Sequence, residues 1–167
     1  MTQLSRAAPG FGRREFGESG FGSAWFALTA AFALHVLDEA TTGFLHVYNP
    51  TVTAMRARWG WFPMPTFEFR QWLVGLSAAV LFCFALTPVA TRGPRWLRPL
   101  AWFYAILMVL NGMGHTVFTI LGRTVPSVTF SRPAPGFYSS PLLSVGSVWL
   151  MMRLRQTASA PGRASPV

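Results

Sequence analysis

Residues 24 to 45 read AWFALTAAFALHVLDEATTGFL, an apolar run in which His35, Asp38 and Glu39 are the ionisable side chains. A transmembrane helix needs about 20 predominantly apolar residues, and this run is long enough. An Asp at the centre of such a helix costs about 2.5 to 3.5 kcal/mol on insertion scales, so ionisable groups there are rare and usually functional. The stretch therefore predicts a membrane-spanning helix that carries part of a buried site.

The composition of the whole chain is typical of a membrane protein. Of 167 residues, 51% are hydrophobic and 11% are charged, whereas soluble domains carry about 25% charged residues. The 14 basic residues are all Arg and lie in short clusters between apolar runs. A nucleic-acid-binding protein would gather them on one face, so we expect no nucleic-acid partner. The single cysteine, Cys83, excludes a disulfide framework and a thiolate metal cage.

Apolar runs predict four membrane spans, at about residues 24–45, 71–91, 97–121 and 137–153. The last span is short and rich in serine, so we expect it to pack against protein on one side. Residues 1–23 and 154–167 are glycine-rich or of low complexity, which predicts disordered tails. The predicted fold is an all-α, four-helix transmembrane bundle over residues 24–153.

The arginines predict the orientation of this bundle, because cytoplasmic segments of membrane proteins carry an excess of basic residues. With a cytoplasmic N-terminus, nine arginines lie on the cytoplasmic side: Arg6, Arg13, Arg14, Arg92, Arg95, Arg98, Arg153, Arg155 and Arg163. Five lie on the other side: Arg56, Arg58, Arg70, Arg123 and Arg132. We therefore expect both termini to be cytoplasmic and the protein to lie in a bacterial inner membrane.

Helical phase places the polar residues of the first span on one face. At 100° per residue, that face holds His35, Asp38, Glu39, Thr42 and, if the helix continues, His46. In the third span Asn111 and His115 are four residues apart and also share a face. Gly112 and Gly114 beside them would let another helix approach closely. Both faces lie in the outer half of the predicted bilayer, so we expect them to form one site.

Imidazoles and carboxylates that converge at low dielectric suit a divalent transition metal such as Zn, Fe or Mn. We predict His35, Glu39 and His115 as metal ligands, because the charge of a metal would compensate acids at this depth. Asp38 would orient a ligand or act as general base toward a metal-bound water, which makes Asp38 and Glu39 the candidate catalytic residues. The accessory candidates are Thr42, His46 and Asn111.

Three alternatives use the same residues. A metal-free membrane isomerase would use Glu39 or Asp38 as acid or base, with His115 as partner. A transporter would use them as a proton relay or ion site; four spans without an inverted repeat disfavour a stand-alone carrier, although a homo-oligomer could form one. A purely structural role is the third, but hydrogen bonds between helices contribute only about 0.6 kcal/mol per pair, which does not offset the insertion of two acids.

The position of the site in the bilayer predicts its substrate class. A membrane lipid or another apolar small molecule can reach such a site sideways. The segment from Pro50 to Phe69 carries Val52, Met55 and Trp59 at helical spacing. This spacing predicts a short helix that lies on the outer membrane face over the site.

The motif residues resemble those of the HXXEE-domain membrane proteins. The resemblance covers roughly residues 30 to 150 and rests on His35-x-x-Asp38-Glu39, Asn111-x-x-x-His115, Gly122-Arg123 and the stretch PGFYSSP at 135 to 141. It implies a small polytopic membrane protein of a family that is supposed to be enzymatic and has no established reaction. Two features depart from the pattern: Asp38 stands where the family has Glu, and the segment between Arg123 and Pro135 is longer than the family's link.

Overall fold

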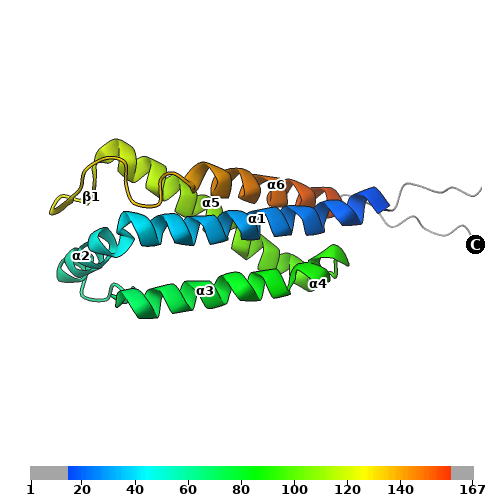
Figure 1. The fold of residues 1–167 in the computed structure, drawn as a ribbon, viewed down its shortest axis with the longest axis horizontal. Coiled ribbons are helices and arrows are strands. Elements are labelled where there is room, and N and C mark those ends of the chain that lie inside the picture. Colours follow the sequence, from blue (N-terminus) through cyan, green and yellow to red (C-terminus); the bar gives the residue numbers. More distant parts are fainter. Residues whose placement is uncertain (1–14, 159–167) are drawn as a thin grey trace, which may run out of the picture.

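The computed structural model describes residues 15 to 158, with side chains from residue 20 to residue 156. The described chain is mostly helical. Its elements are α1 (Glu15–Thr42), α2 (Phe44–Arg58), α3 (Phe69–Ala85), α4 (Thr87–Thr91), α5 (Leu97–Leu121), β1 (Arg123–Val125), β2 (Val128–Thr129) and α6 (Ser140–Ala158) (Figure 1). Within these residues, three segments are long and apolar enough to cross a membrane: Gly20–Thr42, Phe69–Thr91 and Leu97–Leu121. These helices indicate a membrane protein.

Helix α1 contributes more buried core residues than any other helix. Its buried side chains recur every three or four residues and include Phe21, Trp25, Leu28, Phe32, His35 and Glu39. Such spacing places them on one stripe of the helix. Helix α6 packs along α1, as do α3 and α4, and Figure 1 shows α1 between α6 and α3. His35 and Glu39 lie on the same stripe as the apolar residues and are therefore buried with them.

The start of α1 corrects the predicted N-terminal tail. The sequence predicts disorder through residue 23, but the helix begins at Glu15. Phe21 is buried, and a Cβ added at Gly22 would lie 2.6 Å from Thr91 Cγ2 of α4. Glycine here allows two helices to pack closely rather than loosening the chain. Residues 1–14 lie outside the described residues, so the predicted disorder there stays a prediction.

The end of α6 also corrects a predicted boundary. The helix continues to Ala158, past the predicted end of the bundle at residue 153, and Leu154 is buried within it. Residues 159–167, the remainder of the predicted C-terminal tail, lie outside the described residues. Helix α6 begins later than predicted, at Ser140 instead of residue 137. The reason is that Gly136 adopts a left-handed conformation (φ 81°) and residues 135–139 form turns.

Helix α1 ends earlier than predicted, at Thr42. Gly43 adopts a left-handed conformation (φ 79°), which glycine accepts at little cost. Helix α2 then begins at Phe44 and lies across one end of the molecule (Figure 1). The short helix predicted after Pro50 is present, but Pro50 lies inside it and the helix ends at Arg58.

The predicted second span consists of two helices, α3 and α4, with Leu86 between them and Pro88 in the first turn of α4. Helix α3 packs on α1 and α4 and exposes much of its surface. Helix α5 has the predicted bounds and packs chiefly on α6. A short antiparallel hairpin of β1 and β2 follows α5 and was not predicted; it lies at the same end as α2 (Figure 1).

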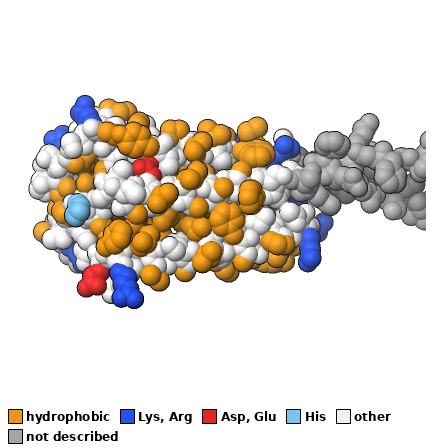
Figure 2. All heavy atoms as spheres, viewed as in Figure 1, with side chains coloured by type: hydrophobic (Ala, Val, Ile, Leu, Met, Phe, Trp, Pro, Cys, Tyr) orange, Lys and Arg blue, Asp and Glu red, His pale blue; other side chains and the backbone are white. Residues whose placement is uncertain are grey.

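The surface distribution of side chains fits a molecule placed across a membrane. In Figure 2, hydrophobic side chains cover the middle of the visible face, and Arg side chains lie toward both ends. Helix α6 buries the stripe Ser140, Leu143, Ser147, Leu150 and Leu154. Its opposite face is apolar as well, with Leu142, Val145, Val148 and Met152 exposed. An apolar exposed face is what a helix in contact with lipid requires.

Candidate metal centre

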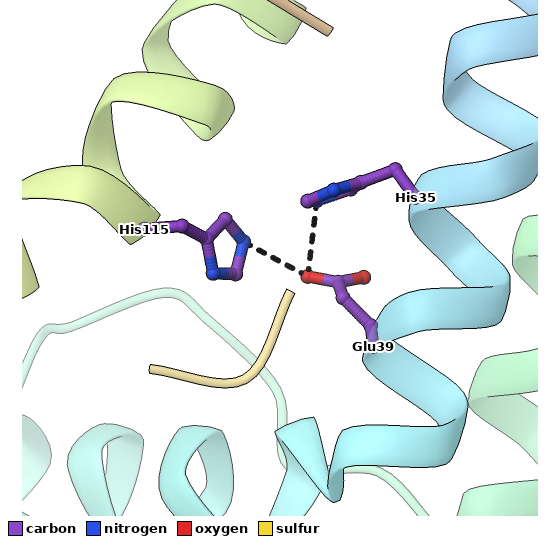
Figure 3. A group of neighbouring side chains, drawn as sticks. All are labelled: His35, Glu39 and His115. Carbon is purple, nitrogen blue, oxygen red and sulfur yellow. Dashed lines mark ion pairs between the residues drawn. The ribbon is translucent and has the colours of Figure 1, made fainter. Parts of the chain in front are cut away.

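His35, Glu39 and His115 meet in the interior between α1 and α5. His35 and Glu39 are one helical turn apart on α1, and His115 approaches from α5 (Figure 3). Glu39 Oε1 lies 3.5 Å from His35 Nε2 and 3.1 Å from His115 Nε2. All three are buried: His35 is 0% exposed, Glu39 4% and His115 6%. The sequence-based prediction that these side chains share one site is therefore confirmed.

The three groups lie close enough together that they could hold one metal ion. One ligand atom from each residue can be chosen so that all three lie within 4.8 Å of one another. Tetrahedral zinc with bonds of about 2.0 to 2.1 Å requires neighbouring ligand atoms to be ~3.4 Å apart. The measured 3.1 and 3.5 Å lie on either side of this value. The cluster could therefore hold a metal ion with small side-chain movements.

A hydrogen-bond chain orients the imidazole of His35. The Ser139 backbone N–H and hydroxyl both donate to Asp38 Oδ2, at 2.8 Å each. Ser139 Oγ also lies 2.8 Å from His35 Nδ1. Since the single hydroxyl proton of Ser139 is directed to the carboxylate, Nδ1–H must be the donor to Ser139. In the neutral imidazole with its proton on Nδ1, Nε2 presents a lone pair.

That lone pair has no hydrogen-bond partner among the described residues. His35 Nε2 faces Glu39 Oε1, so two acceptor atoms adjoin each other in a buried site. An unpaired buried acceptor is costly, and a cation between the two atoms would satisfy both. A metal ion at this position, or a second proton on His35, supplies the positive charge that the two atoms require.

The loop before α6 closes the site on one side. Gly136 donates its N–H to Thr42 Oγ1 at 3.0 Å and accepts from Ser140 Oγ at 2.7 Å. A Cβ added at Gly136 would lie 2.7 Å from His115 Cε1 and 2.9 Å from Glu39 Cγ. Glycine is therefore required here both by the positive φ and by the contact with the cluster.

The other predicted site residues lie near the cluster in different ways. Asp38 contacts the cluster only through Ser139, and Thr42 holds the loop at Gly136. Asn111 lines a cavity beside the cluster. His46 is exposed and lies on α2, because the break at Gly43 ends the helical phase on which its predicted position depends.

Sequence reasoning missed Ser139 and Gly136 as parts of the site. Both lie in the segment that precedes α6, far from the first motif in sequence. The available signal was the pair Pro135-Gly136 followed by two serines, which is typical of a turn that leads into a helix. That signal predicts the turn but not the side chains that the turn contacts.

A cavity of about 640 Å³ adjoins the cluster between α1, α3 and α5, and Glu39 lines it together with mainly apolar side chains. A smaller cavity of about 260 Å³ lies on the hairpin side and is lined by His115. Cavities thus adjoin the cluster on more than one side.

Comparison of the chain with known protein families, with curated proteins and with solved structures finds no match.

Proposed function

We propose that the chain is an integral membrane enzyme that uses a metal ion bound by His35, Glu39 and His115 to act on a lipid or another apolar substrate. The ion is a divalent transition metal of the Zn, Fe or Mn type, since two imidazoles and a carboxylate are ligands that these ions accept. The same residues support a relationship to the HXXEE-domain proteins, with Asp38 in place of their first Glu.

The observation that carries this proposal is the unsatisfied lone pair of His35. The Asp38–Ser139 pair sets the imidazole so that Nε2 is free, and Nε2 faces the carboxylate of Glu39. Metal-binding histidines commonly donate their other ring N–H to such a partner, which fixes the tautomer and the ring orientation. A purely structural hydrogen bond within α1 would instead direct an N–H from His35 to Glu39.

Catalysis is supported by the number of ligands. Catalytic zinc sites have three protein ligands and leave a further position open, whereas structural sites have four. The cluster offers three ligands, and a cavity reaches it at Glu39. A metal in such a site polarises a substrate carbonyl or activates a bound water. Asp38 serves in this scheme as a positioning residue, because its Oδ2 accepts two hydrogen bonds from Ser139.

The membrane arrangement that we propose has four spans, with α6 as the fourth, and both termini in the cytoplasm of a bacterial cell. The exposed apolar face of α6 and its packing along α1 and α5 support this role. The start of α1 and the end of α6 lie at the same end of the molecule (Figure 1), as an even number of spans requires.

A metal-free acid–base enzyme is the second candidate, and one distance favours it. His115 Nε2 lies 3.1 Å from Glu39 Oε1, which suits a direct hydrogen bond between an acid and a base. Such a pair could move a proton to or from an apolar substrate in the adjoining cavity. It leaves the lone pair of His35 unexplained, so we place it second.

Metal analysis of the detergent-purified protein tests the proposal. We expect close to one transition-metal ion per chain, and its loss on His35→Ala, Glu39→Ala or His115→Ala, because each change removes one of three ligands. His46→Ala is the matched control, since His46 is a membrane-end histidine outside the cluster. Metal-free protein after purification with added Zn²⁺, Fe²⁺ and Mn²⁺ would favour the acid–base candidate instead.

A further inference from the structure

The larger cavity is long. Along α1 its lining runs from Trp25 to Glu39, and along α3 from Gln71 to Cys83, with Leu86 just beyond the end of α3. At 1.5 Å per residue, both distances are about 20 Å. The hydrocarbon core of a bilayer is about 30 Å thick, so the cavity extends through much of its depth.

The carboxylate and amide side chains of the cavity lining lie at one end. Glu39, Gln71 and Asn111 line the end beside α2, where the metal centre lies. Leu86, Leu100 and Phe103 line the opposite end. The hydroxyl of Tyr104, farther along the wall, lies beside the side chains of Thr29 and Cys83. A ligand that matches these walls has a polar head and a long apolar tail.

The cavity also has an open side. Helix α3 packs on α1 and α4 but makes no extensive contact with α5. A Cβ added at Gly75, which lines the cavity from α3, would meet nothing within 4 Å. The space is therefore not closed by the chain itself, and a molecule in the membrane can enter between α3 and α5.

The size of the cavity is that of a small-molecule site. Its volume of about 640 Å³ is within the range of about 300 to 1,000 Å³ found for such sites.

We infer that the cavity binds one long hydrocarbon chain of a fatty acid or its ester, with the carbonyl head at the metal centre and the tail at Leu86 and Leu100. The position of the head rests on the proposed function. A divalent ion with one carboxylate and two neutral imidazoles leaves a net positive charge that attracts a carbonyl or carboxylate oxygen. The position of the tail rests on the cavity alone.

Two photoactivatable analogues of palmitic acid test this inference, one with a diazirine near the methyl end and one with a diazirine next to the carboxyl group. Full-length protein in nanodiscs with Zn²⁺ is irradiated, and adducts are mapped by mass spectrometry. The methyl-end probe should label α3 near Leu86 and α5 near Leu100. The carboxyl-end probe should label residues near Glu39 and Asn111. Equal labelling of both ends by either probe would overturn the orientation.

Substitution at the cavity wall separates bound ligand from surrounding lipid. Gly75→Phe places a ring in the open space and should lower labelling at the tail end by about tenfold. Ala78→Phe is the matched control, because Ala78 is exposed on the same helix and does not line the cavity. Ala79→Phe, which does line it, should repeat the effect of Gly75→Phe if that variant folds poorly. Equal labelling of wild-type, Gly75→Phe and Ala79→Phe proteins would refute the chain site.

Metal content is measured on the same samples, so that failure of the metal-dependent function can be distinguished from failure of the chain site. Tail-end labelling that Gly75→Phe removes, in a protein without bound metal, would support the chain site and contradict the metal-dependent function. Bound metal without such labelling would contradict the chain site and leave the metal centre standing. Palmitate added in excess should compete with both probes in the wild-type protein.

Discussion

Ser139 connects Asp38 and His35, although these two residues belong to the same sequence motif. Its hydroxyl donates to Asp38 Oδ2, and its oxygen accepts from His35 Nδ1. Asp38 thus orients the His35 imidazole through Ser139, which lies just before α6. The position of His35 thus depends on the packing of α6 against α1 as well as on α1 itself.

Removing this hydroxyl should weaken metal binding without abolishing it. We expect Ser139→Ala to lower metal affinity by about 10- to 100-fold, as is typical for residues that orient a ligand. Ser147→Ala is the control, because Ser147 is also buried but donates to the carbonyl of Leu143, away from the cluster. Competition with a chelator gives the affinities. An equal loss in both variants would indicate a general effect on folding.

At the residue scale, the sequence predicts the ligands better than their surroundings. His35 and Glu39 are four residues apart on a helix, so their common face follows from helical geometry. His115 could be grouped with them because few ionisable side chains occur in the apolar runs. Ser139 and Gly136 approach from a different segment, and their contacts depend on tertiary packing that no local pattern records.

At the element scale, two neighbouring glycines of α5 have different roles. A Cβ added at Gly112 would lie 2.5 Å from Ser144 Oγ and 2.9 Å from Ser140 O, so Gly112 allows α6 to pack closely. At Gly114 the nearest neighbour would be Phe118 Cε2 at 3.8 Å, an ordinary contact within the same helix. The predicted close approach of another helix therefore holds at Gly112 and not at Gly114.

The two glycines should respond differently to alanine. Gly112→Ala should lower the free energy of unfolding by about 1 to 3 kcal/mol, because it overpacks the contact between α5 and α6. Gly114→Ala should be neutral or stabilising by up to about 1 kcal/mol, because alanine favours the helix. Thermal or denaturant unfolding in detergent, followed by circular dichroism, measures both. Similar stabilities for the two variants would contradict the assigned contact.

The apolar runs predict the elements but not all of their limits. Helix α5 has the predicted bounds because its apolar run is flanked by arginines and glycine. Helix α1 begins earlier than predicted. A glycine-rich sequence predicts a flexible segment, but composition alone does not show that a glycine such as Gly22 packs against another helix. Helix α1 ends earlier than predicted because Gly43 forms a left-handed turn. The apolar run continues past Gly43, so the sequence pattern does not show this end.

At the scale of the whole molecule, the arginines of the described residues do not distinguish the two sides. Arg92, Arg95, Arg98, Arg153 and Arg155 belong to the segments predicted as cytoplasmic, and Arg56, Arg58, Arg70, Arg123 and Arg132 to those on the other side. The numbers are equal. The predicted excess therefore comes from Arg6, Arg13, Arg14 and Arg163, which lie in the tails outside the described residues.

The orientation should therefore depend on the N-terminal arginines. In the wild-type protein, a reporter fused after Val167 should be cytoplasmic and one inserted near Pro65 should lie on the opposite side. Replacement of Arg6, Arg13 and Arg14 by Gln removes most of the excess, so the C-terminal reporter should then appear on both sides. Replacement of Arg56, Arg58 and Arg70 is the matched control, because it increases the excess and should leave the orientation unchanged. A C-terminus outside the cytoplasm in the wild-type protein would contradict the proposed orientation, and it would place the metal centre in the opposite half of the bilayer.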